Sequence, residues 1–139
     1  ISTALAQSSV IGGAFTIQFA ERNPLSLRII ARGINARTLI TKTATGDQGI
    51  FLRREIFEAI GGFAEWPFFE DVQLVAKMKE KGKFAILRAP VTISARRYLA
   101  NGPWRTTFLM YALRIGYWMG IHPTKLYRWF QDVRLPKRD

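Results

Sequence analysis

The sequence predicts one α/β domain over residues 1–139, a mixed sheet flanked by helices with further helices at the C-terminal end. Segments with the two-residue period of strands alternate along the chain with segments of helical period. The residues are 48% hydrophobic and 22% charged, which excludes a disordered tail or a fibre. The longest apolar segment, residues 104–121, contains Arg105 and Arg114, so no stretch reaches the roughly 18 apolar residues of a transmembrane helix.

The first third of the chain predicts a strand followed by a helix. Residues 1–9 have the pattern of a helix end. Val10–Phe19 alternates apolar and polar side chains after a glycine pair, which is typical of a half-buried strand. Asn23 is expected to cap a helix that Pro24 opens and that runs to about Thr41, because both residue types favour the start of a helix.

The middle of the chain predicts a turn, a short buried strand and two helices. The turn is expected at residues 43–47 and the strand at 50–52. Residues 53–60 predict a short helix that ends at a glycine pair, since glycine accepts the left-handed conformation that closes many helices. A longer helix is expected over Glu70–Lys81, where apolar residues recur with helical spacing until the next glycine.

The last third predicts two short strands and two helices. The strands are expected at residues 84–87 and 91–94, on either side of an Ala-Pro pair, and the helices at 103–120 and 123–133. Five aromatic residues of the first helix are expected in the core: Trp104, Phe108, Tyr111, Tyr117 and Trp118. Because arginines are interleaved with them, a helix that lies on a membrane surface remains an alternative.

Positive charge is the most unusual feature of the composition. The chain has 21 Lys and Arg against 10 Asp and Glu, a formal net charge of +11. Most of this excess lies between Arg88 and Asp139. A basic surface predicts an anionic partner: nucleic acid, phospholipid headgroups or a phosphorylated small molecule. The absence of Cys and the single His122 exclude disulfides, cysteine-based sites and histidine metal clusters.

Three short segments hold residues suited to chemistry, and the first is the loop of Gly46, Asp47 and Gln48. The glycine lets the backbone approach a ligand closely, while the acid and the amide offer an acceptor and a donor. A plain turn, in which Asp47 hydrogen-bonds its own backbone, explains the same residues. The local sequence leaves both interpretations open.

The second segment is Glu70-Asp71, which follows an aromatic loop that contains Trp66. Asp71 begins the i, i+3, i+4, i+7 apolar stripe of its helix, so its side chain is expected to face inward. A carboxylate in that position is well placed to accept a proton from a bound hydroxyl. In the alternative interpretation Glu70 is the N-cap and Asp71 a first-turn acid that stabilises the helix through its dipole.

The third segment is Arg96, Arg97 and Tyr98, expected at the end of the last strand. Arginines there can hold a diphosphate in bidentate fashion, with Tyr98 and Trp104 as stacking surfaces. A solvated basic edge is the alternative, because arginines are mostly exposed to water.

Taken in order, residues 46–51, 53–63, 70–82 and 94–98 resemble four motifs of the C-terminal half of family 2 glycosyltransferases. Within that family the chain is similar to a small bacterial group called radical-SAM/selenodomain-associated transferase 2. The resemblance covers nearly the whole chain. It implies the C-terminal portion of a GT-A fold, the fold of nucleotide-diphospho-sugar transferases. It also implies an enzyme that transfers a sugar from a nucleoside-diphosphate sugar to a hydroxyl acceptor with inversion.

The resemblance assigns roles to the candidate residues. Asp71 matches the catalytic base, with Glu70 as its neighbour and Trp66 on the acceptor side. Residues 46–48 match the loop near the transferred sugar and the acceptor. Residues 96–98 fall where relatives have a Gln-x-x-Arg-Trp motif or other diphosphate contacts; here the Gln is absent and Tyr stands in place of Trp.

The donor side of such an enzyme is missing from these 139 residues. In the family an N-terminal nucleotide-binding half carries an Asp-x-Asp motif that holds Mg²⁺ or Mn²⁺, and no Asp-x-Asp occurs here. The expectation is therefore an acceptor-side half that contains no metal ligands and has no transferase activity by itself. Such a half is expected to expose part of its sheet, which would favour homo-oligomers.

Two non-enzymatic alternatives remain open. A basic module could bind nucleic acid through the last third of the chain, but no RNA-binding aromatic motif or helix-turn-helix pattern is present. A peripheral contact with an anionic membrane through residues 104–130 would explain the mixture of aromatic and basic residues. The second alternative is compatible with the cytoplasmic location that the absence of Cys allows, and with a transferase that uses lipid-linked acceptors.

Overall fold

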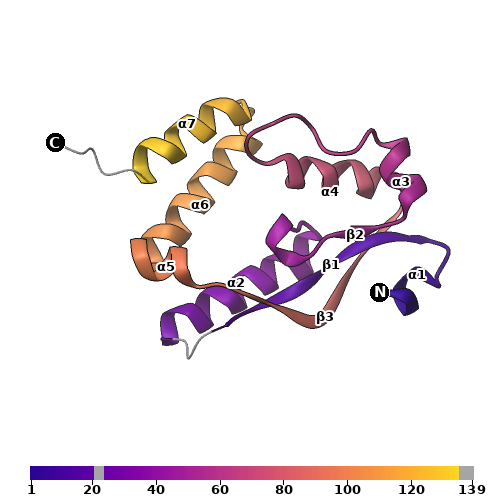
Figure 1. The fold of residues 1–139 in the computed structure, drawn as a ribbon, viewed down its shortest axis with the longest axis horizontal. Coiled ribbons are helices and arrows are strands. Elements are labelled where there is room, and N and C mark those ends of the chain that lie inside the picture. The colour runs from indigo at the N-terminus through magenta and orange to yellow at the C-terminus, as the bar shows by residue number, and fades with distance from the viewer. Residues whose placement is uncertain (21–23, 135–139) are drawn as a thin grey trace.

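The structure, a computed structural model, describes residues 1–20 and 24–134. It is a mixed α/β fold in which helices flank a three-stranded sheet (Figure 1). In chain order the elements are α1 (Ser2–Leu5), β1 (Val10–Phe19), α2 (Leu25–Thr41), the 3₁₀ turn η1 (Gly46–Gln48), β2 (Phe51–Leu52), α3 (Arg54–Ala59), α4 (Glu70–Lys81), β3 (Lys83–Ile93), α5 (Arg96–Asn101), α6 (Pro103–Trp118) and α7 (Pro123–Arg134). The α/β class is confirmed, and the expected cap Asn23 lies outside the described residues.

The sheet has the strand order β2-β1-β3, so the first strand lies in its middle. β3 runs parallel to β1 along nearly its whole length, whereas β2 pairs antiparallel with β1 at Gly12 and Gly13. A side chain at Gly12 would collide with the Phe51 carbonyl oxygen, and one at Gly13 with that of Ala85. The glycine pair is therefore required by the close approach of both neighbouring strands.

The two short strands expected on either side of Pro90 are one strand, β3, so that prediction is wrong. Phe15 pairs with Leu87. The next residue of β1, Thr16, pairs with Pro90, so two residues of β3 bulge out of the ladder. The Thr16 hydroxyl donates to the Arg88 carbonyl at 3.0 Å within this bulge. A proline is tolerated here because β3 is an edge strand.

Two side chains, rather than a strand, close the edge of β1 beyond the short β2. The Asn35 carboxamide on α2 accepts from the Ile17 N–H at 2.8 Å and donates to the Ile17 carbonyl at 2.9 Å. Gln48 donates from Nε2 to the Phe15 carbonyl at 3.2 Å. These bonds replace those that a neighbouring antiparallel strand would make.

The buried side chains form three clusters. The first joins α4 to the sheet through Ile11, Ala14, Leu74, Val75, Met78 and Phe84. The second joins the start of α4 to the C-terminal helices through Phe69, Val72, Leu113, Leu126 and Phe130. The third joins α2 to the end of β1 through Phe19, Leu27, Ile30 and Ala95. The first cluster contains Leu74, Val75 and Met78, the apolar stripe that the sequence predicts for α4.

Most aromatic residues of α6 lie outside the core, which corrects the expectation from the sequence. Phe108 is 79% exposed, and Trp104 and Trp118 are 57% and 59% exposed. Tyr111 is also exposed, and among the five only Tyr117 is half-buried, packed against neighbouring rings. The buried face of α6 is made instead of Thr106, Leu113, Arg114 and Gly116. Among the described helices, none has the length and apolar character that crossing a membrane requires.

Candidate functional site

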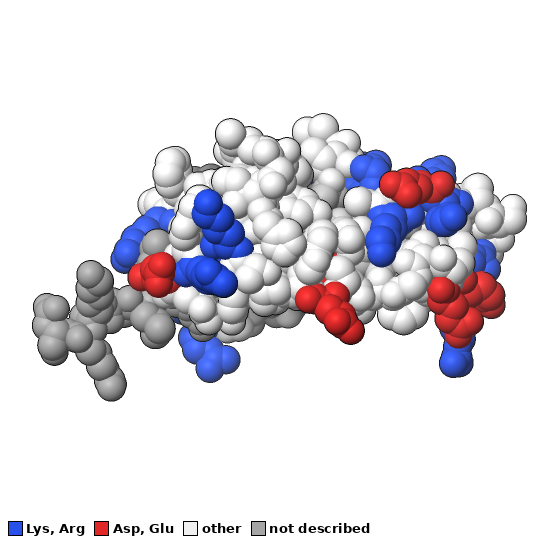
Figure 2. Space-filling view, turned by 90° about the horizontal axis from the view of Figure 1, so that it is seen from above, with Lys and Arg blue, Asp and Glu red and all other residues white. Residues whose placement is uncertain are grey.

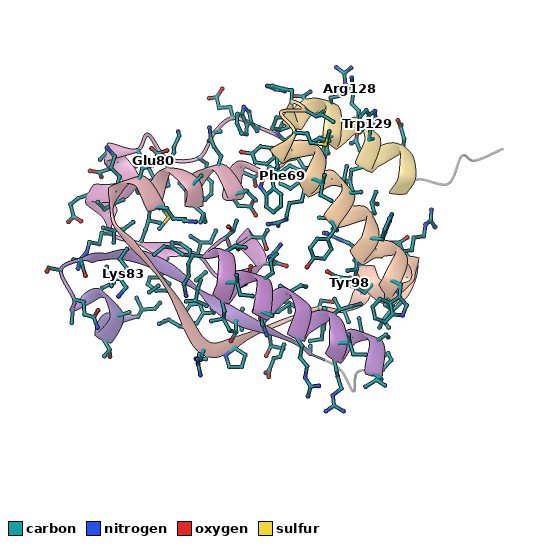
Figure 3. All side chains as sticks on the ribbon, turned by 180° about the vertical axis from the view of Figure 1, so that it is seen from behind. Phe69, Glu80, Lys83, Tyr98, Arg128 and Trp129 are labelled. Carbon is teal, nitrogen blue, oxygen red and sulfur yellow. The ribbon has the colours of Figure 1, made fainter. Side chains whose placement is uncertain are left out.

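A cavity of about 780 Å³ lies between α2, η1, the start of α4, α5 and α6. Its volume is that of a small-molecule site. Figure 3 shows Tyr98 in the space between α2 and α6, and Phe69 at the start of α4 on the side of α6. The charged and tyrosine residues that line it are Arg37, Asp47, Glu70, Asp71, Arg96, Arg97, Tyr98, Tyr111 and Arg114. The cavity thus brings together the predicted site residues Gly46, Asp47, Glu70, Asp71, Arg96, Arg97 and Tyr98.

Asp71 lies in the first turn of α4, where its carboxylate joins the cavity wall to η1. Its Oδ2 accepts from the Gly46 N–H at 2.6 Å, across 25 residues of sequence. Its Oδ1 accepts from the Val72 N–H at 2.7 Å. The side chain is half-buried and lines the cavity. Two backbone donors therefore hold the carboxylate in place, while each oxygen keeps a second lone pair for a further donor.

The loop of Gly46, Asp47 and Gln48 is a 3₁₀ turn whose residues divide between the cavity and the interior. Gly46 and Asp47 line the cavity, and Asp47 accepts from the Thr45 hydroxyl at 2.6 Å. Gln48 is fully buried and supports the loop from behind. Its amide donates to the Thr38 hydroxyl at 3.1 Å and accepts from the Thr45 N–H at 3.1 Å. The part of the loop available to a ligand is therefore its first two residues.

Glu70 and Trp66, the other residues expected on the acceptor side, lie differently from one another. Glu70 lines the cavity beside Asp71. It is not the N-cap of α4, because Phe69 occupies that position in a left-handed conformation with φ of 62°. Trp66 does not line the cavity; its ring packs edge-on against Tyr117 and His122, with centroids 6.4 and 6.0 Å away. Trp66 therefore supports the aromatic loop.

Residues 96–98 lie at the start of a helix, α5, and not at the end of a strand as the sequence predicts. The chain turns here because the Ser94 hydroxyl accepts from the Arg96 N–H at 3.2 Å. Both arginines of this segment are exposed at the rim of the cavity. Tyr98 is half-buried, with its ring edge-on to Phe19 at 5.2 Å. Burial, and then the nearby Asp47 carboxylate, raise the pKa of Tyr98.

Two further arginines line the cavity from the inside. Arg114 on α6 is only 5% exposed, and its Nη1 has no hydrogen-bond partner among the described residues. Arg37 on α2 is half-buried, its Nε is likewise without a partner, and its Nη2 reaches only the Thr38 hydroxyl at 3.4 Å. Burial first, and then the positive charge of Arg37, lower the pKa of Arg114 to about 10. Burial also lowers the pKa of Arg37.

Neither arginine is among the site residues predicted from the sequence, although the apolar stripe of α2 carries a signal for Arg37. Arg37 follows Ile30 by seven residues and Ile34 by three, so it continues the apolar stripe of α2. Arg114 has no such signal, because large apolar residues surround α6 on every side. A charged residue on an otherwise inward face of a helix is a marker for a buried site.

The described residues contain no group of three or more His, Cys, Asp or Glu that could hold a metal ion. Comparison of the chain with protein-family models, curated proteins and solved structures finds no match.

Proposed function

We propose that the chain is the acceptor-side half of an inverting glycosyltransferase with the GT-A fold, and that Asp71 is its catalytic base. The observation that carries this proposal is the position of the Asp71 carboxylate, which lines a cavity of about 780 Å³ and is held by the Gly46 N–H at 2.6 Å. The order of the sequence motifs supports the class of reaction, and the cavity supports a substrate site beside Asp71.

In the proposed reaction the acceptor hydroxyl gives its proton to Asp71 as its oxygen attacks the anomeric carbon. The bond between that carbon and the diphosphate oxygen breaks on the opposite side, and the nucleoside diphosphate leaves with the bonding electrons. A positioned base of this kind contributes about 10²- to 10⁴-fold to rate. Gly46 and Asp47, on the same wall, are suited to bind the acceptor or the transferred sugar.

The leaving diphosphate gains negative charge, and exposed arginines at the rim can stabilise it. Arg96 and Arg97 are suited to this because guanidinium groups bind phosphate oxygens in bidentate fashion. The family uses Mg²⁺ or Mn²⁺ for the same purpose, on the donor side.

The test is the variant Asp71→Asn in a protein that contains both the donor and acceptor halves. The measurement is release of nucleoside diphosphate from a panel of nucleotide sugars. We expect turnover to fall at least about 100-fold while donor binding persists, because only the proton acceptor is lost. Asp132→Asn, an exposed acid on α7, is the matched control and should keep full turnover. Near-normal turnover of Asp71→Asn would remove Asp71 from the base role.

A second candidate function, contact with an anionic membrane surface, is favoured by the exposed face of α6. Trp104, Phe108, Ile115 and Trp118 are exposed with the spacing of a single helical stripe. Two exposed basic residues, Lys125 and Arg128, lie on the neighbouring helix α7. Figure 2 shows basic side chains at the end of the molecule that holds α7. Aromatic residues beside basic ones suit the interface between anionic headgroups and acyl chains.

Flotation with lipid vesicles tests this contact. The chain should float with vesicles that contain phosphatidylglycerol and remain below with pure phosphatidylcholine. The double variant Phe108→Ser/Trp118→Ser should lose flotation, whereas Ile40→Ser, at an exposed apolar residue of α2, should keep it. Equal flotation of the double variant would exclude the α6 face as the membrane contact.

A further inference from the structure

The arginines of the cavity fall into an exposed pair and a recessed pair. Arg96 and Arg97 lie at the rim on α5. Arg37 and Arg114 come from two helices, α2 and α6, that are far apart in sequence and contact each other in the fold. We call Arg37 and Arg114 the recessed pair. An anion between the two guanidinium groups would therefore be bound by α2 and α6 together.

The charges of the recessed pair lack counter-ions within the described residues. The one ion pair found there joins Arg54 to Glu58 on the exposed surface of α3. Asp71 and Asp47 lie near enough to act on Arg114 electrostatically, but neither forms an ion pair with it. Asp71 accepts from the Gly46 and Val72 N–H groups instead.

Buried positive charges without partners are costly, and two that act on each other are costlier still. Folded proteins rarely leave a guanidinium nitrogen without a hydrogen-bond partner in a buried position. Here both members of the pair have such a nitrogen, Nη1 in Arg114 and Nε in Arg37, and both side chains line the same cavity. A dianion placed between them would supply the missing charge and acceptors together.

We infer that Arg37 and Arg114 form a recessed binding subsite for a phosphate-class oxyanion, separate from the exposed arginines of the rim. Phosphate matches the pair because its oxygens accept from two guanidinium groups at once and its charge balances both. The Tyr98 and Tyr111 hydroxyls line the same cavity and can add donors. The binding itself depends only on the geometry, whereas the identity of the molecule that carries the phosphate rests on the proposed function.

Binding to the 139-residue chain tests the subsite by calorimetry and by the shift of the thermal midpoint. The probes are inorganic phosphate, glycerol 3-phosphate and uridine diphosphate, each against sodium chloride of equal ionic strength. We expect at least one phosphate probe to bind and to raise the midpoint when chloride does not. Tighter binding of glycerol 3-phosphate would assign the phosphate to the acceptor, and tighter binding of uridine diphosphate would assign it to the donor.

Variants separate a subsite from general attraction to a basic protein. Arg114→Met and Arg37→Gln should each weaken binding of the best probe about 10- to 100-fold, the usual effect of losing charge-assisted hydrogen bonds. Arg105→Met, at an exposed arginine of α6, should change it less than about threefold. Because Arg114→Met is expected to fold at least as stably as the parent chain, lost binding would not reflect lost structure.

Three outcomes would overturn the subsite: no binding of any phosphate probe, unchanged affinity in Arg114→Met, or an equal loss in Arg105→Met. Asp71→Asn should retain phosphate binding. Phosphate binding together with full turnover of Asp71→Asn would therefore refute the proposed base while keeping the subsite. If Asp71→Asn loses turnover but the parent chain does not bind phosphate, the subsite is refuted and the proposed base is kept.

Discussion

Replacing Arg114 by Met should stabilise the protein in the absence of phosphate. Arg114 is 5% exposed and carries a positive charge that no described residue pairs. Burial is the chief cause that lowers its pKa to about 10, well below the ordinary value of an arginine. A change of this size corresponds to about 3 kcal/mol by which folding disfavours the charged form at neutral pH. Met has a similar length and no charge to bury, so it removes this penalty while keeping most of the packing.

We expect the free energy of unfolding of Arg114→Met to rise by about 1–3 kcal/mol, within the range seen when buried charges are replaced by apolar side chains. For a chain of this length that is roughly 3–10 °C in the thermal midpoint. The gain should shrink as the pH rises above about 10, because the folded parent then begins to release a proton that the unfolded chain still holds.

Urea unfolding followed by circular dichroism, in phosphate-free buffer, measures this change. Arg105→Met, at an exposed arginine of the same helix, should alter stability by no more than about 0.5 kcal/mol. A loss of more than about 1 kcal/mol in Arg114→Met would mean that the guanidinium stabilises the fold. That result would refute the reasoning that treats Arg114 as a charge kept for a ligand.

Three further predictions concern the sheet and the cavity. Gly13→Ala should destabilise the fold by about 2 kcal/mol or more, because its Cβ would collide with β3. Gly33→Ala, with open space around it on α2, should be neutral or stabilising by up to about 1 kcal/mol. Equal midpoints of the two variants in thermal unfolding would contradict this. Asn35→Ala should cost about 1–3 kcal/mol and speed hydrogen exchange at the Ile17 amide, and an unchanged exchange rate would count against the edge bonds. Since burial raises the pKa of Tyr98, the free energy of unfolding should fall as the pH rises through and above 10. The fall should be smaller in Tyr98→Phe. If denaturant unfolding gives the same dependence on pH for both proteins, Tyr98 does not contribute.

Much of the fold could be predicted from the local sequence pattern, and the predictions that were wrong failed because of tertiary contacts. α4 begins and ends at Glu70 and Lys81 as expected, because its apolar period is regular and a glycine follows it. Pro90 predicts a break, but the bulge that absorbs it depends on pairing with β1. In α6 large apolar residues surround the whole helix, so periodicity could not tell the buried face from the exposed one.

The candidate site was predictable only where its residues lie in compact motifs. Asp71 and Gly46 belong to separate motifs, and in the fold the Gly46 N–H donates a hydrogen bond to the Asp71 carboxylate at the cavity wall. Arg37 and Arg114 belong to no motif. They lie 77 positions apart in the sequence, and the contact between α2 and α6 brings them to one cavity. Gln48 shows the opposite error, since its motif suggests a ligand contact while its buried amide serves the loop.

The side-chain hydrogen bonds along β1 limit where the sheet can be extended. Asn35 and Gln48 are hydrogen-bonded to the backbone of Ile17 and Phe15, so a further strand cannot pair with β1 at these residues. Among the described residues the two edges of the sheet are the two-residue β2 and the much longer β3, and the bulge at Pro90 interrupts the edge of β3. The longest regular edge that this sheet offers to a further strand is therefore the stretch of β3 from Lys83 to Leu87, before the bulge.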